Sequence, residues 1–124
     1  MKRVVVTGIG IWSCLGQNKE EVTLSLKQGK SGIGIDEARK EYGLISPLTG
    51  IVPTPELKSL LHRRIRMSMS QEAMYAYMAS REAFEQAGIN EQYLLENEVG
   101  VLFGNDSTAQ ATIEMHEIMR EKHD

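Results

Sequence analysis

The stretch VVVTGIGIWSCLG, residues 4–16, decides the fold, because it joins a β-branched run to two closely spaced glycines. Residues 4–6 have the pattern of a buried strand, and Gly8 and Gly10 predict a tight bend at its end. A glycine turn after a strand can also hold a dinucleotide phosphate at a helix N-terminus. That site needs a third glycine soon after the second, and Gly16 comes too late. A strand that ends in a glycine bend is the favoured interpretation.

The same stretch contains Cys14, the single cysteine of the chain. One cysteine excludes an internal disulfide and a CxxC metal or redox motif, and it suits a reducing cytoplasm. A catalytic thiol needs an adjacent histidine or a helix N-terminus, but the first histidine in the sequence is His62. Cys14 is therefore interpreted as a small buried hydrophobic residue.

The composition is that of a soluble globular segment: 124 residues, 41% hydrophobic and 25% charged. A formal net charge of −3 gives no general attraction to nucleic acid or to an anionic membrane. Lys2 and Arg3 precede an apolar run, as in a signal peptide, but Thr7 and the glycines interrupt that run. No stretch approaches the length of a membrane span.

The next segments predict one helix and a long surface excursion. Asn18, with a glutamate three residues later, caps a helix expected over residues 19–28. Residues 29–34 are expected to form a loop, because the GKSG sequence lacks the remainder of a phosphate-binding motif. Residues 35–58 are turn-rich and are expected to include a brief strand at residues 49–52.

Residues 59–87 have a helical composition, and Gly88 is expected to end the helix. Small residues recur along one face, where another backbone can approach closely. Tyrosine, methionine and phenylalanine side chains on the other faces predict that the helix is buried on several sides. The small residues are Ala73, Ala76, Ser80, Ala83 and Ala87.

The last third of the chain predicts a second strand between two helices. Asn90 can cap a short turn through Leu95, and residues 99–104 form an apolar run that ends in glycine. Ser107 opens an expected final helix. Two or three strands with three helices cannot complete a parallel sheet covered on both faces. The sequence thus predicts an α/β segment that is incomplete at its C-terminus.

The final helix also raises the possibility of a metal site. His116 is followed by Glu117, as in the zinc-protease helix motif. That motif requires a second histidine at position 120, where this chain has Arg120. A solvated helix face is the better interpretation, and no metal is expected.

Several ordered motifs resemble one family. The segment KRVVVTGIGIWSCLGQNKEEVTLSLKQGKSGI, residues 2–33, is similar to the N-terminus of the β-ketoacyl-acyl-carrier-protein synthases, and RRIRMSMSQEAMYAY, residues 63–77, resembles their arginine-rich helix start. AFEQAGI and VGVLFG match later family segments. The pattern leans toward elongating synthases. The resemblance implies a thiolase-like α-β-α-β-α fold, active as a homodimer, of which residues 1–124 would be most of the first half.

The resemblance also implies a reaction, decarboxylative Claisen condensation of an acyl group with malonyl-acyl carrier protein. It places the nucleophilic cysteine and the two assisting histidines beyond Asp124, so the segment alone is expected to be inactive. Cys14 does not match the nucleophile. No cofactor is implied, and acyl carrier protein is the expected partner. The open alternatives are a non-catalytic partner similar to a chain-length factor and a nucleotide-binding domain.

Two groups of site residues follow from the resemblance. Arg63, Arg64 and Arg66 are expected to form part of the docking patch for the acidic carrier protein, with a solvated surface as the alternative. Asp106 and Ser107 occupy a loop that borders the acyl pocket, where the synthases usually have a glycine-rich sequence. This departure leaves the chain-length preference open.

Overall fold

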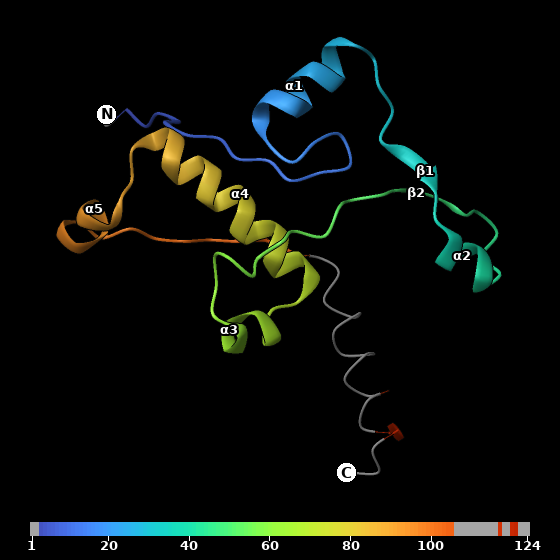
Figure 1. Ribbon diagram of the computed structural model, residues 1–124. Coiled ribbons are helices and arrows are strands. Elements are labelled where there is room, and N and C mark those ends of the chain that lie inside the picture. Colours follow the sequence, from blue (N-terminus) through green and yellow to red (C-terminus); the bar gives the residue numbers. More distant parts are fainter. Residues whose placement is uncertain (1–2, 106–116, 118–119, 122–124) are drawn as a thin grey trace.

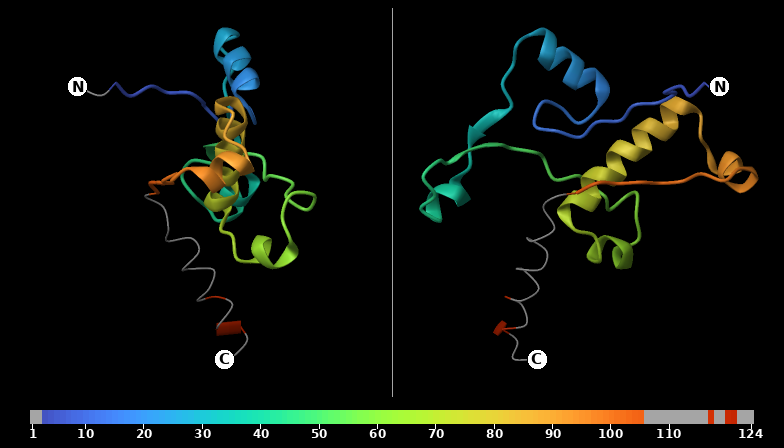
Figure 2. Two further views of the ribbon diagram at one scale, coloured as in Figure 1. Left: turned by 90° about the vertical axis from the view of Figure 1, so that its left-hand side faces the viewer. Right: turned by 180° about the vertical axis from the view of Figure 1, so that it is seen from behind.

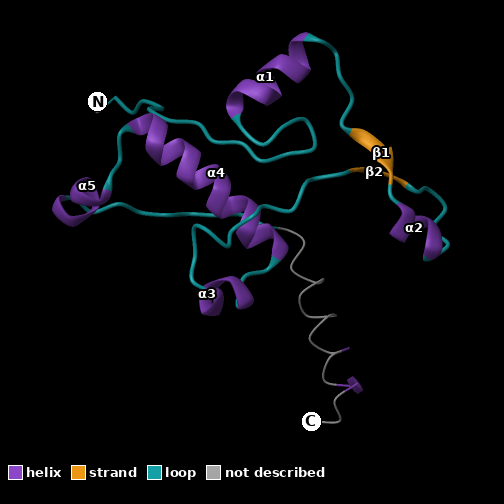
Figure 3. Cartoon of the chain, viewed as in Figure 1, coloured by secondary structure: helices purple, strands orange, loops and turns teal. Residues whose placement is uncertain are grey.

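The computed structural model describes residues 3–105, 117 and 120–121 of the chain. Helices and short strands alternate along it, as Figures 1 and 3 show. In chain order the elements are α1 (Lys19–Lys27), β1 (Ile33–Ile35), α2 (Glu37–Glu41), β2 (Leu48–Gly50), α3 (Arg63–Met67), α4 (Gln71–Ala87) and α5 (Glu91–Glu96).

Helix α4 is the element beside which two other segments of the described chain lie. The Ser70 hydroxyl accepts a hydrogen bond from the amide N–H of Ala73 at its start, and Gly88, with φ +71°, ends it in the left-handed conformation that glycine adopts without strain. Residues 3–12 run beside α4, and the segment after α5 passes it on the way to residue 105, as Figures 1 and 2 show. The predicted end of this helix at Gly88 is confirmed.

Two glycines bring the N-terminal segment against α4. A Cβ atom on Gly8 would lie 2.1 Å from the Ala83 carbonyl oxygen, and one on Gly10 would lie 1.7 Å from the Ala79 carbonyl oxygen. Real side chains never approach this closely, so only glycine fits. The prediction that small residues on this helix admit another backbone is confirmed at Ala83 and Ala87, while Ala79 was not among the residues predicted. The tight bend expected at these glycines was wrong, because residues 3–12 contain no turn and neither glycine has a positive φ; both serve close approach instead.

Helix α1 begins where its sequence predicts. Asn18 Oδ1 accepts from the Glu21 amide N–H at 2.8 Å, and the Glu21 carboxylate accepts from the Gln17 amide N–H at 2.8 Å. Val22 and Ser25 of this helix are buried, and the Ser25 hydroxyl donates to the Leu15 carbonyl at 2.7 Å. The helix expected over residues 19–28 is confirmed, with its end one residue earlier.

Strands β1 and β2 form a small antiparallel sheet that lies at the far end of the molecule from α5 (Figure 1). Ile33 pairs with Gly50 and Ile35 pairs with Leu48, and α2 fills the connection. The strand expected over residues 49–52 is present as β2, which begins one residue earlier and ends two residues earlier. The loop expected over residues 29–34 was wrong at its end, because pairing with a distant segment draws Ile33 into β1.

The two long strands expected from the sequence are not formed. Residues 4–6 and 99–104 adopt no ladder pairing within the described chain, and Val4 and Leu102 are 93% and 97% exposed. A strand is stabilised by hydrogen bonds to a neighbouring strand, and apolar composition alone does not supply one. Both segments pass α4 instead.

The single helix expected over residues 59–87 was also wrong, because it divides into α3 and α4. The Ser68 hydroxyl donates to the Ile65 carbonyl at 2.8 Å, which ends α3, and Ser70 caps the next helix. Serine competes with the backbone in this way and favours helix ends. The burial expected for α4 was wrong as well, since none of its residues is buried. The predicted turn after Asn90 is confirmed as α5, while the helix expected from Ser107 lies outside the described residues.

Candidate functional site

Helix α3 carries the arginine cluster, and the preceding turn holds the helix in place. The Leu57 carbonyl accepts from the amide N–H groups of Leu60 and Leu61, at 3.1 and 2.9 Å. Leu57 itself is 3% exposed, the lowest value among the buried hydrophobic residues of the described chain. The turn is therefore anchored by one apolar side chain, and α3 begins directly after it.

The residue before α3 closes its first turn. The His62 Nδ1 atom accepts from the Arg64 amide N–H at 3.3 Å, and the His62 carbonyl accepts from the amides of Ile65 and Arg66 at 3.0 and 3.2 Å. Three of the first amide groups of α3 therefore find an acceptor on one residue. Histidine is an uncommon cap, so its role was not signalled by the sequence pattern.

The three predicted docking arginines are brought onto this one helix, but their environments differ. Arg63 and Arg64 are exposed, and neither forms an ion pair within the described residues. Arg66 is half-buried, and its Nε donates to the Leu61 carbonyl at 3.1 Å. Two guanidinium groups are thus free to meet an anionic partner, while the third is hydrogen-bonded to its own turn.

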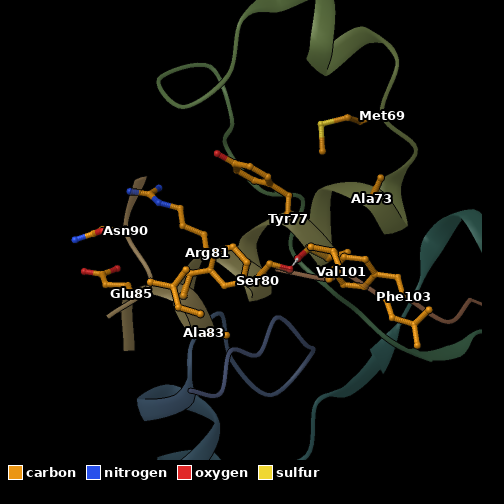
Figure 4. Close-up of a pocket in the computed structure, with 15 residues that line it drawn as sticks. Met69, Ala73, Tyr77, Ser80, Arg81, Ala83, Glu85, Asn90, Val101 and Phe103 are labelled. Atoms are coloured by element: carbon orange, nitrogen blue, oxygen red, sulfur yellow. Dashed lines mark hydrogen bonds between the residues drawn. The ribbon is translucent and has the colours of Figure 1, made fainter. Parts of the chain in front are cut away.

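The predicted acyl-pocket residues Asp106 and Ser107 lie outside the described part of the chain. The segment just before them borders an open apolar cavity of about 1050 Å³ against α4. Figure 4 shows Tyr77 and Ser80 of the helix facing this space with Val101 and Phe103 from the segment. The described lining of the cavity is mostly apolar, with Arg81 and Glu85 as its charged members.

Cys14 occupies a packed turn. A bridge between Ser13 and Gly16 closes the turn, and the cysteine is half-buried inside it. A Cβ on Gly32 would lie 2.7 Å from the Cys14 Sγ atom, and one on Gly50 would lie 3.1 Å from it. The thiol therefore fills space between two glycines, which supports a structural role.

The N-terminal glycine motif is used for packing and not for a phosphate. The Ile9 amide N–H donates to Gln86 Oε1 at 2.7 Å, and the Ile11 amide N–H donates to Glu82 Oε2 at 2.8 Å. These are the amides that a nucleotide loop would offer to a phosphate. Since α4 already supplies their acceptors, the structure argues against the nucleotide-binding alternative. Glu82 and Gln86 could not be found from local patterns, because Ile11 and Ile9 lie 71 and 77 residues away from them.

The described residues offer neither a metal-binding cluster nor a membrane-spanning helix. Residues 3–105, 117 and 120–121 contain no group of three His, Cys, Asp or Glu side chains that could hold a metal ion. Of the residues weighed for a metal, His116 falls outside these ranges. None of the helices described is long and apolar enough to cross a membrane.

Comparisons with known proteins agree with one another. The sequence profile described as "Beta-ketoacyl synthase, N-terminal domain" matches residues 1–124. The chain is 38% identical over 104 residues to 3-oxoacyl-[acyl-carrier-protein] synthase 1 of Haemophilus influenzae, covering 84% of this chain and 25% of that protein. The synthase 1 of Escherichia coli K12 is 36% identical over 106 residues, with coverage of 85% and 26%.

A solved structure is similar as well. The crystal structure of a beta-ketoacyl synthase from Burkholderia phymatum STM815 matches with a TM-score of 0.81 at 27% identity, covering 100% of this chain and 31% of that one. The chain therefore spans about a quarter to a third of the length of these relatives.

Proposed function

The chain belongs to the β-ketoacyl synthase family, and from this premise we propose that the complete protein condenses an acyl group with malonyl-acyl carrier protein. The observation that carries the proposal is the match of the family profile along residues 1–124, together with relatives named as 3-oxoacyl-[acyl-carrier-protein] synthases. The expected thiolase-like α/β class is confirmed by the structural match.

The proposed reaction has two stages. A cysteine thiolate accepts the acyl group from its carrier thioester, and the carrier thiol leaves. Malonyl-carrier protein then loses carbon dioxide, and the resulting carbanion attacks the acyl carbonyl and expels the thiolate. Two histidines assist by stabilising the enolate oxygen that develops. All three groups belong to the part beyond Asp124, and the role of residues 1–124 is structural and recognitional.

The recognition role falls to α3. Arg63 and Arg64 are exposed cations without an ion pair in the described chain, and Arg66 lies one turn further along the same helix. Carrier proteins that bear acyl groups are acidic, so this cluster steers their approach. The chain as a whole carries a net charge of −3 and does not attract an acidic protein. The attraction must therefore come from the local cluster of arginines.

Residues 1–124 form, in this proposal, the N-terminal part of a larger domain. The exposed apolar side chains of Val4, Val5, Val6, Leu102 and Phe103 are the surface that the rest of that domain covers. Asp106 and Ser107 border the acyl pocket. The complete protein acts as a homodimer in the cytoplasm.

The test is a condensation assay with the complete protein, acyl-carrier protein and malonyl-carrier protein. Formation of a 3-oxoacyl-carrier product together with carbon dioxide supports the proposal. Carrier binding without product would instead identify a non-catalytic partner similar to a chain-length factor. The 124-residue segment alone should give no product.

A further inference from the structure

Helix α3, which carries the proposed docking arginines, is too short to be stable by itself. Helix α3 has only five residues, Arg63 to Met67, and isolated helices of this length are unstable in water. Its conformation must therefore come from contacts at its ends. The contacts at the N-terminal end converge on two residues, Leu61 and His62.

His62 supplies most of these contacts. Its ring Nδ1 accepts from the Arg64 amide, and its carbonyl accepts from the amides of Ile65 and Arg66. The ring nitrogen can accept this bond only when it carries no proton. The exposed imidazole makes no other hydrogen bond or ion pair within the described chain, so its side chain serves the helix alone.

The orientation of Arg64 depends on this cap, because its own amide N–H is the donor. Arg63 precedes it, directly after His62. Arg66 is held separately through Nε to the Leu61 carbonyl, so the second turn stays tied to the same loop when the cap is lost. Loss of the cap should loosen the two exposed arginines selectively.

We infer that His62 is a positioning residue for carrier-protein docking: its imidazole fixes the first turn of α3 so that Arg63 and Arg64 face the partner together. This inference rests on the proposed function of the arginine cluster. It assigns a role to a residue that touches neither the acyl group nor the reacting atoms.

Loss of the cap should lower the fraction of molecules in which α3 is formed. A helix that is formed for only part of the time binds its partner with an affinity reduced by that fraction. Replacing a serine or asparagine cap with alanine lowers the helical equilibrium by about fivefold, which sets the upper limit for loss of the histidine cap. The Michaelis constant for carrier-bound substrate should therefore rise, because only that substrate contacts α3.

The experiment measures the Michaelis constants of the complete protein for a carrier-bound acyl substrate and for a short acyl thioester without the carrier. His62→Ala should raise the carrier-bound value about two- to fivefold and leave the carrier-free value unchanged. His62→Asn should restore the original value, because the asparagine amide oxygen is a strong cap acceptor. Lys27→Glu on the exposed end of α1 is the control for altered surface charge.

A double-mutant cycle separates docking from general structure. In the Arg63→Glu/Arg64→Glu protein, His62→Ala should add no further change, because the groups it positions are gone. An equal rise for both substrates, a full additive effect in this background, or no rescue by His62→Asn would each overturn the inference. Thermal unfolding midpoints confirm that each variant remains folded.

The two proposals fail in different ways. If Arg63→Glu/Arg64→Glu leaves the carrier-bound Michaelis constant unchanged, the docking proposal fails and the inference with it. If that double variant raises the constant but His62→Ala does not, docking by the arginines stands and only the positioning role of His62 is overturned.

Discussion

The Glu82 carboxylate accepts a hydrogen bond from the amide N–H of Lys19 at 2.7 Å, across 63 residues of sequence. Its second oxygen accepts from the Ile11 amide at 2.8 Å. Lys19 is the first residue of α1, where amide groups lack a partner inside the helix and a negative charge is favourable. One side chain on α4 thus joins the N-terminal segment and α1 to the same helix.

Removal of this carboxylate should destabilise the complete protein. Glu82→Ala leaves two partly buried amides without acceptors, at an expected cost of about 1–3 kcal/mol in the free energy of unfolding. Glu82→Gln keeps one acceptor oxygen and should cost less. Denaturant midpoints give the comparison, with Glu85→Ala as the exposed control on the same helix. Equal effects of Glu82→Ala and Glu85→Ala would contradict the bridging role.

The close approach of Gly10 to α4 predicts a severe effect of a single methyl group. In Gly10→Ala the new Cβ meets the Ala79 carbonyl oxygen at 1.7 Å, and a helix backbone cannot move aside cheaply. The expected loss exceeds about 3 kcal/mol of stability, and the yield of soluble protein should fall. Gly100→Ala is the matched control, because no atom lies within 4 Å of its Cβ position. A folded Gly10→Ala protein with an unchanged melting temperature would show that the contact is looser than described.

The packing of Cys14 predicts that its thiol is dispensable for chemistry. Cys14→Ser in the complete protein should retain condensation and lose a modest amount of stability, because a hydroxyl is less favourable than a thiol between Gly32 and Gly50. Labelling by a thiol-directed acyl mimic tests this point. If labelling disappears in Cys14→Ser, the nucleophile has been placed wrongly.

Ser107 supplies a prediction about chain length. In the proposed function its loop borders the acyl pocket, so a large side chain there should shorten the longest acyl group that the complete protein accepts. The change is Ser107→Phe, and the measurement is the product profile with carrier-bound acyl groups of increasing length. An unchanged profile would exclude a pocket role for this position.

Tyr75 predicts a pH dependence at the alkaline end. Burial raises the pKa of the Tyr75 hydroxyl above its ordinary value, and the charge of Glu72 raises it further, while the hydrogen bond from Gln71 acts in the opposite direction. Folding therefore favours the neutral phenol. Its contribution to stability is fully present below about pH 10 and is lost as the pH rises through the folded-state pKa.

The Tyr75→Phe variant isolates this contribution. Above about pH 10 its unfolding free energy should fall less steeply than that of the original protein, although it lacks the bond from the hydroxyl to the Val52 carbonyl. Urea unfolding at several alkaline pH values measures the two slopes. Parallel slopes would mean that Tyr75 titrates alike in the folded and unfolded chains.

Local signals predicted the helix ends well. Asn18, Gly88 and Asn90 act on amides or carbonyls within a few residues, so α1, the end of α4 and α5 follow from short windows of sequence. Pairing of Ile33 with Gly50 depends on a segment 17 positions away (50 − 33), and β1 was missed for that reason. The arginine cluster was visible from its composition.

Long-range contacts set the limit of prediction. The partners of Glu82 lie 63 and 71 residues away, and no periodicity in α4 marks this glutamate out from its neighbours. The apolar runs near Val4 and Leu102 predicted strands, but composition gives only the tendency to pair and not the partner. The role of His62 could not be predicted either, because serine, threonine, asparagine and aspartate are the usual helix caps and histidine is not.

Between their two contacts, the N-terminal segment and α4 advance by nearly the same distance. Two residues of extended chain advance about 6.8 Å, while four residues of helix advance about 6 Å. The contacts of Gly8 with Ala83 and of Gly10 with Ala79 are therefore one matched step apart, and the mismatch grows with each further step. The chain turns away soon afterwards, in the turn closed by the Ser13 bridge. Inserting one residue ahead of Gly10 would present isoleucine to the helix backbone, so the length of this segment is fixed as tightly as its composition.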